Sequence, residues 1–260
     1  MKAALVSVAV ILQIAIAHAE VSSEDMNNSN NPLTPMAAVN LHDYFQTSVF
    51  GTDESLNTAY LRIASPMMLG GMPQLARMTI PYMPAALETP TSTTSGVGDI
   101  SIFDVFLIGN TGGMQMGVGP LLVMPTASKD ETGAGKWQIG AAGVLMYPNP
   151  TGLLGALLTY QHDFAGDSDR PTQNLATLQP FFIYNMPGGF YVRSTGIMMF
   201  NWETGDYNVP IGAGVGKVWK LEGGTTVNFF GEPQWTVAHE GQYTPNFQTF
   251  VGLNFQFPLK

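Results

Sequence analysis

The chain has 260 residues, a formal net charge of −9 and no cysteine, and only 11% of its residues are charged. Soluble domains usually carry about 25% charged residues, so this chain is too poor in charge to cover an ordinary water-exposed surface. Its acidic balance argues against a nucleic-acid partner, which needs a basic surface. The lack of cysteine excludes disulfides and a lipid anchor attached through cysteine.

The N-terminus has the order of a secretory signal peptide. Lys2 precedes an apolar run from Ala3 to Ile16, and the small-residue sequence Ala17-His18-Ala19 follows it. This order predicts a signal peptide over 1–19 that is removed before Glu20, with a membrane anchor as the alternative. No later apolar run is long enough for a membrane helix. An exported, charge-poor chain without such helices can cross a lipid bilayer only as a closed β-barrel, which predicts the bacterial outer membrane.

Two segments show the alternation that a barrel strand requires. In NFQTFVGLNFQF (246–257) the odd positions are mostly apolar and the even positions mostly polar. From Trp137 to Tyr147 an apolar face carries an aromatic residue at each end. Ten residues at ~3.3 Å each, tilted by ~40°, span about 25 Å, the height of the apolar band of a membrane barrel.

We predict an all-β fold, a transmembrane antiparallel up-and-down β-barrel of about 12 strands of the outer-membrane type. Short turns such as NTG and PG alternate with mostly longer polar connections such as ALETPTSTTS and TASKDETGAG, which places both termini on the periplasmic side. The predicted strands are 42–52, 57–69, 74–85, 96–109, 113–125, 136–148, 152–165, 174–186, 189–202, 207–221, 225–238 and 246–258.

Three segments follow from this pattern: the signal peptide at 1–19, a polar N-terminal tail at 20–41 and the barrel at 42–260. The 20–41 segment is rich in Asn, Ser and Pro and has no periodicity, so we interpret it as a periplasmic tail, with a plug of the barrel as the alternative.

The stretch Gly133-Ala134-Gly135-Lys136-Trp137 suggests a phosphate-binding loop only superficially. Such a loop needs a glycine five positions before the Gly-Lys pair and a Ser or Thr after it. Asp130 and Trp137 occupy those positions, so we expect a loop that leads into a strand.

Alternate residues of a strand face opposite sides of the barrel wall, and this alternation selects candidate lumen residues. Most of them are polar, as a water-filled interior requires. Asp104 is assigned to the lumen because Phe103, Val105 and Leu107 are assigned to the outer face. The candidates are Asp104, Thr159, Gln161, Thr177, Gln179, Phe181, Asn185 and Arg193.

Acidic residues gather in the predicted outer loops. They are expected either to form a solvated surface, to bind divalent cations that bridge lipopolysaccharide, or to bias the mouth toward cations. They are Asp130, Glu131, Asp167, Asp169, Glu203 and Asp206.

Several strings in one order resemble a known family. They include SGVGDISIFDVFLI (95–108), GVGPLLVMPTAS (117–128), GAGKWQIGAAGVL (133–145), FAGDSDRPTQNLATLQPFFIYNMPGGFYV (164–192) and VPIGAGVGKVWKL (209–221). The chain resembles, from about Leu56 to Lys260, the bacterial outer-membrane family labelled putative MetA-pathway of phenol degradation. The resemblance implies a transporter-like barrel and, by its label, uptake of aromatic compounds. It supplies no catalytic residues.

We therefore predict a passive channel for small solutes, with aromatic or hydrophobic compounds among them. The rival hypotheses are a non-conducting structural or adhesive barrel, a lipid-modifying barrel enzyme and a soluble periplasmic β-protein. No enzyme activity, cofactor or metal is expected. The expected partners are outer-membrane lipids, lipopolysaccharide, small solutes and the barrel-assembly machinery.

Overall fold

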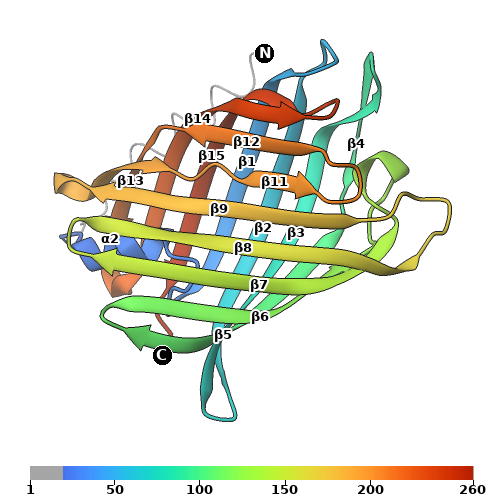
Figure 1. Cartoon of the computed structure of the whole chain (residues 1–260). Helices are drawn as coiled ribbons and strands as arrows, with labels where there is room; N and C mark the ends of the chain where they lie inside the picture. The colour runs from blue at the N-terminus through green and yellow to red at the C-terminus, as the bar shows by residue number, and fades with distance from the viewer. Residues whose placement is uncertain (1–19, 260) are drawn as a thin grey trace.

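The computed structural model describes residues 20–259, in which the strands form one closed antiparallel barrel (Figure 1). Its wall has 12 staves, each a single crossing of the barrel. The sheet nevertheless contains 15 strands, because some staves are interrupted and count as two strands. These are β4 with β5, β10 with β11, and β12 with β13. The prediction of an all-β, twelve-strand antiparallel barrel is confirmed.

The strands vary widely in length. They are β1 Ala37–Val49, β2 Leu56–Leu69, β3 Met72–Thr89, β4 Ser92–Val97, β5 Ile100–Thr111, β6 Met114–Met124, β7 Lys136–Asn149, β8 Gly152–Gly166, β9 Asn174–Asn185, β10 Phe190–Ser194, β11 Met198–Asn201, β12 Tyr207–Gly212, β13 Gly214–Lys220, β14 Thr226–Glu240 and β15 Pro245–Phe257. One α-helix, α2 (Ser23–Asn30), precedes them, and short 3-10 turns occupy Asp130–Thr132, Pro187–Gly189 and Glu222–Gly224.

The barrel closes between the first and last strands, where Leu41 of β1 lies opposite Leu253 of β15. Each remaining stave pairs with its sequence neighbours, so every strand except β4, which pairs with β3 alone, has a hydrogen-bonded partner strand on both sides. Closure removes the unpaired edges that an open sheet of this size would expose.

Side chains alternate between the two faces of the wall. In β7, Trp137 and Tyr147 are 39% and 42% exposed on the outer face, whereas Gln138, Val144 and Met146 are buried on the inner face. In β15 the even positions from Gln248 to Gln256 are buried, and the odd positions between them face outward. The outer face is therefore apolar with aromatic residues near its rims, as the alternation in the sequence indicates.

The first strand begins earlier than predicted. Residues 37–41 belong to β1 and pair with β15, although the polar tail was expected to continue to residue 41. The expected outer loop around 86–95 is also largely a hairpin, in which β3 continues to Thr89 and β4 begins at Ser92. Its hydroxyl-rich residues favour extended structure, and the Thr89 and Ser92 hydroxyls bond each other at 2.7 Å. Figure 1 shows this hairpin projecting at the upper right.

The ninth and tenth predicted strands are both interrupted. Residues 195–197 separate β10 from β11, and Ala213 separates β12 from β13. At the first break the backbone at Gly196 lies close to that of β12. A Cβ added to Gly196 would be only 2.5 Å from the Pro210 carbonyl oxygen. Pro210 has no N–H to donate to a neighbouring strand, which weakens the regular ladder at this level.

The glycine–lysine stretch is a loop that leads into β7, as its failed motif indicates. Gly135 adopts a positive φ of 67°, a conformation that favours glycine, and β7 begins at Lys136. The carboxylate of Asp99 secures the loop by accepting from the backbone N–H groups of Ala127 at 3.0 Å and Ala134 at 2.7 Å.

The predicted signal peptide at 1–19 lies outside the described residues. Within residues 20–259, no helix is long and apolar enough to cross a membrane.

Candidate functional site: the plugged lumen

The N-terminal segment lies inside the barrel at the end with the short turns. In Figure 1, α2 sits at the left end of the barrel beside the turns that join β7 to β8 and β9 to β10. Its residues Met26, Asn27 and Ser29 are buried. Of the two interpretations of 20–41, tail or plug, this placement has the geometry of a plug.

The helix is short and begins at a well-formed cap. The hydroxyl of Ser22 accepts from the Asp25 N–H at 3.1 Å, and the Asp25 carboxylate accepts from the Ser22 N–H at 2.9 Å. This reciprocal capping box satisfies two N-terminal donors that would otherwise lack partners. An isolated helix of eight residues is unstable in water, so α2 depends on its contacts with the barrel.

Amide side chains fix one side of the plug to the wall. Asn27 donates to the Asn149 carbonyl at 2.8 Å and accepts from the Asn185 amide at 3.0 Å. Asn31 donates to Gln115 at 2.7 Å. These contacts tie the plug to the turns after β7 and β9 and to β6.

Strands on the other side of the lumen supply a second set of contacts. Asn228 of β14 donates to the Ser29 carbonyl at 3.0 Å, and Gln256 of β15 donates to the Asn28 carbonyl at 2.8 Å. Lys220, at the end of β13, forms an ion pair with Asp25 at 2.9 Å. The plug is therefore held from several directions around the barrel.

The environment of Asp25 favours its charged form. Burial by itself raises the pKa of this carboxyl, but hydrogen bonds from the Ser22 hydroxyl and N–H and the contact with Lys220 outweigh that effect. The pKa of Asp25 therefore lies below its usual value of 3.8. The ionised carboxylate is the form that docks.

A cavity of about 90 Å³ lies in the lumen beside the plug. Ser29, Asn31 and Thr34 form its floor, while the wall contributes both apolar and polar groups. Its charged side chains are all basic: Arg62, Arg77 and Arg193 line it, together with His42. No carboxylate lines it among residues 20–259.

Arg193 is the only one of these arginines in an ion pair within the described chain. Its Nε donates to Glu232 at 2.8 Å, and its guanidinium lies 3.5 Å above the ring of Phe230. Glu232 also accepts from the Thr195 N–H and hydroxyl, both at 2.8 Å, and from Gln234 at 3.0 Å. These hydrogen bonds and the ion pair compensate for the removal of this fully buried carboxylate from water.

The structure places most of the predicted lumen residues on the inner wall. Thr159 and Thr177 share a hydrogen bond of 2.6 Å, Gln161 donates to Gln138 at 2.9 Å, and Gln179 donates to the Thr195 carbonyl at 3.2 Å. Phe181 and Arg193 line the cavity. Asn185 contacts the plug rather than open lumen.

Asp104 is the exception, and its assignment to the lumen is wrong. Phe103 and Val105 are buried on the inner face, whereas Ile102 and Ile108, which share the parity of Asp104, are 37% and 61% exposed on the outer face. The sequence misled because the inner wall is apolar here, where it packs near the plug residue Leu33. With its amide nitrogen turned toward Asp104, Gln74 donates to that carboxylate at 2.6 Å.

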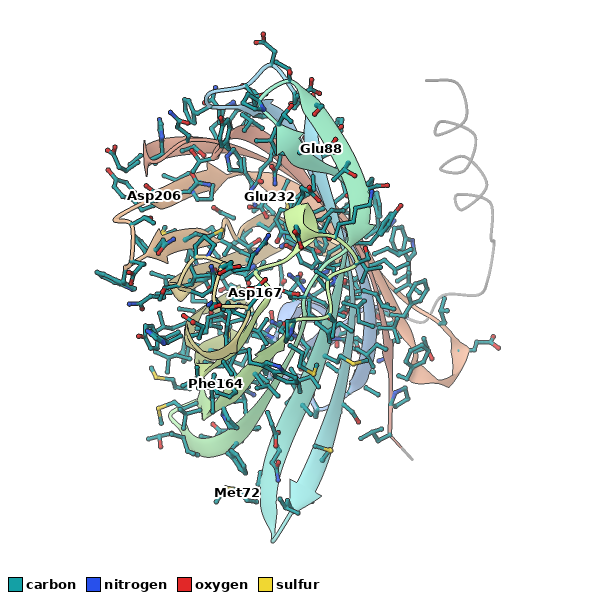
Figure 2. All side chains as sticks on the ribbon, turned by 90° about the vertical axis from the view of Figure 1, so that its right-hand side faces the viewer. Met72, Glu88, Phe164, Asp167, Asp206 and Glu232 are labelled. Carbon is teal, nitrogen blue, oxygen red and sulfur yellow. The ribbon has the colours of Figure 1, made fainter. Side chains whose placement is uncertain are left out.

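The acidic loop residues stand on separate loops at the other end of the barrel. Asp130 lies 3.9 Å from Arg170, and Asp167 accepts from the Asp169 N–H at 2.9 Å. In Figure 2, Asp167 and Asp206 lie on different loops. Glu131 and Glu203 are exposed. Among residues 20–259, no group of three or more acidic, His or Cys side chains could hold a metal ion.

Arg62, Arg77 and Glu232 also belong to the lumen, although they were not among the predicted lumen residues. The sequence contained a signal for Arg62, because this charged residue stands between the apolar residues Leu61 and Ile63 in β2. Such flanking is typical of a lumen-facing charge, although Asp104 has the same flanking pattern and faces outward. The sequence signal for the helix within 20–41 is the Ser22–Asp25 spacing, which is that of a capping box.

The outer wall carries an apolar groove beside the interrupted strands. Its lining residues are Phe182, Val192, Arg193, Ser194, Ala213, Gly214, Val215, Gly231 and Pro233. Arg193 lines both this groove and the inner cavity.

These features define a closed antiparallel β-barrel with a polar, partly plugged lumen and an apolar outer face. Among solved structures, the fold is similar to that of an outer membrane channel from Pseudomonas putida F1, with a TM-score of 0.63 and 12% identity over 85% of this chain and 96% of that one. It is also similar to the porin NanC, with a TM-score of 0.51 and 10% identity over 86% of this chain and 100% of that one. At these identities the likeness concerns the fold.

No family model matches the chain, and no curated protein matches it. These comparisons therefore do not confirm the resemblance to the phenol-degradation family.

Proposed function

We propose that this protein is an outer-membrane channel for small solutes whose periplasmic end is closed by the 20–36 segment. The single observation that carries the proposal is a closed barrel whose outer face is apolar and whose lumen is lined with polar and charged groups. The outer face suits lipid and the lumen suits water, as in membrane barrels that conduct. The similar fold of an outer membrane channel and of a porin supports the proposal.

The plug makes the proposed channel a gated one. Residues 26–34 fill the lumen beside the short turns, and most of their polar contacts to the wall are single hydrogen bonds. Each such bond contributes only about 1 kcal/mol net, so partial withdrawal of the segment does not require the barrel to unfold.

The proposal extends to the class of solute that passes through the channel. Phe181, Phe230 and Phe250 project into the lumen among polar neighbours, and the apolar groove on the outer wall reaches Arg193. These surfaces support passage of small compounds with an aromatic or apolar part. No catalytic role is proposed for any residue.

We also propose that the acidic loops face the outside and contact lipopolysaccharide through divalent cations. Carboxylate oxygens are suitable ligands for Ca²⁺ and Mg²⁺. A double change of Asp167→Asn and Asp169→Asn should then weaken the stabilisation of the reconstituted barrel by Mg²⁺. An unchanged Mg²⁺ response would leave these loops as an ordinary solvated surface.

The test of the channel function is single-channel conductance in a planar bilayer. The chain refolded from residue 20 should give small, intermittent steps, and a variant lacking 20–35 should give larger and more persistent ones because the lumen is unobstructed. Heat-dependent migration on gels would verify that both barrels are folded. If neither folded protein conducts, the result would favour a non-conducting structural barrel.

A further inference from the structure

We infer that Arg62 and Arg77 form a binding site for a small oxyanion, a carboxylate or a phosphate group, in the lumen cavity. The inference deepens the proposed function by naming the charge of the solute that the lumen selects. It rests on the placement, the missing partners and the rigid support of these two side chains.

The two arginines are neighbours on the inner wall. Arg62 of β2 lies opposite Thr79 of β3, and Arg77 of β3 lies opposite Ala64 of β2. They are therefore diagonal partners on adjacent strands, a geometry in which long side chains reach each other. Both line the cavity beside the plug.

Their positive charges have no counter-charge in the described structure. Within residues 20–259, the ion pairs involve Lys136, Arg170, Arg193 and Lys220, and neither Arg62 nor Arg77 is among them. The buried Nε atoms of both arginines also lack a hydrogen-bond partner. Two adjacent guanidinium groups repel each other, and an anion between them would convert that repulsion into attraction.

Neighbouring rings hold both guanidinium groups in place. Arg62 lies 4.7 Å from the centre of the Tyr60 ring, and Arg77 lies 4.1 Å from the centre of the Phe103 ring. Stacking occupies a face of each group and leaves N–H edges for a ligand.

His42 orients Arg62 from the other side. Arg62 donates to His42 Nδ1 at 2.6 Å, and His42 Nε2 in turn donates to Asn254 at 2.8 Å. A ring nitrogen that accepts from a guanidinium carries no proton, so His42 serves as a neutral support. The arginines are therefore preorganised, which reduces the ordering cost of binding.

Cavity size and lining limit the ligand. A cavity of about 90 Å³ has room for one carboxylate or phosphate group. The amides of Asn40, Gln179 and Asn254 also line the cavity and can donate to oxygen.

The position of this pair gives it more influence on ion selectivity than the acidic loops have. Loop carboxylates lie in open solvent, where salt screens a charge within about 8–10 Å. The arginines line a cavity inside the lumen, where low-dielectric walls focus the field. We therefore expect anion preference in place of the cation preference that the acidic loops alone suggested.

Inorganic phosphate is the first probe, measured by isothermal titration calorimetry on the full chain refolded from residue 20 in non-ionic detergent. Arg62→Gln and Arg77→Gln should each weaken binding roughly tenfold, because each removes a charged hydrogen-bond donor. The matched control is Arg170→Gln, which removes the same charge from an outer loop and should leave binding unchanged. Arg77→Lys keeps the charge and should bind at an intermediate level.

Acetate as a second probe distinguishes a site for any small oxyanion from one that requires phosphate. Absence of saturable binding of both ions to the folded protein, or equal binding by the Arg62→Gln/Arg77→Gln variant, would overturn the inference. Circular dichroism identifies a variant that has failed to fold, in which case Arg77→Lys supplies the comparison.

Conductance separates this site from the channel itself. In a KCl gradient, the variant lacking 20–35 should show a reversal potential of the sign that indicates anion preference, and the two Arg→Gln changes should reduce it. Cation preference would overturn the site and leave the channel standing. Phosphate binding without any conductance would leave the site standing and overturn the channel.

Discussion

The carboxylate of Glu232 lies 2.8 Å from Nε of Arg193 on the inner wall, and only 0% and 5% of these two side chains are exposed. The pair neutralises one of the three arginines around the cavity. Arg62 and Arg77 therefore supply the uncompensated charge of the lumen.

Removal of the carboxylate from this pair should destabilise the barrel. Glu232→Gln leaves Arg193 buried without a counter-charge, and the loss of one partner of a buried pair costs about 3–5 kcal/mol. Urea unfolding in lipid vesicles, followed by tryptophan fluorescence, would measure the change. Glu203→Gln, on an exposed turn, is the control and should change stability by less than ~0.5 kcal/mol. Equal stabilities of the two variants would show that Arg193 is solvated in the lumen.

The docking of the plug should weaken in acid. Because the pKa of Asp25 is lowered in the docked state, its contribution is fully present above the ordinary value of 3.8 and is lost as the pH falls through the docked-state pKa. Conductance should therefore rise when the pH is lowered from 7 to about 3. Asp25→Asn should show higher conductance already at pH 7 and a smaller response to acid. An identical response in this variant would assign the effect to other groups.

Asn27 should contribute more to plug docking than an exposed residue of the same helix. Asn27→Ala leaves the Asn149 carbonyl and the Asn185 amide without this partner, and each buried polar group left unsatisfied costs about 1–3 kcal/mol. Hydrogen exchange of residues 23–34 should accelerate, with longer open times in the bilayer. Glu24→Ala, which is exposed, should behave like the parent. Equal exchange in the two variants would contradict the docking geometry.

Two glycines of β7 should respond differently to the same substitution. A Cβ on Gly140 would overlap the Tyr160 carbonyl oxygen of β8, whereas a Cβ on Gly143 meets no atom within 4 Å. Gly140→Ala should force the strands apart and cost more than ~2 kcal/mol, and Gly143→Ala should be nearly neutral. Folded yield and urea midpoints would measure both. Similar midpoints would mean that the wall adapts easily at Gly140.

The sequence by itself determined the fold class, the number of staves and the faces of most strands. Period-two alternation such as that of 246–257 is a local property, because successive side chains of any strand point to opposite faces. The alternation of turns and loops also lies in the chain order. The face of Lys217 follows the same rule: it shares the outer face with Trp219 and lies 4.4 Å from the centre of the Phe190 ring.

Only the tertiary structure decided how the lumen is filled. Leu33 of the plug packs in the same buried cluster as Phe103 and Val105, so the inner wall is apolar here. The expectation that the polar residue Asp104 faces the lumen therefore fails. The plug sequence has no periodicity that predicts its position. Its helix is held by single contacts to Asn149, Asn185 and Lys220, which lie far along the chain. Arg62 and Arg77 are neighbours within the β2–β3 hairpin, but the approach of Arg193 to them depends on barrel closure, which brings together strands that are distant in sequence.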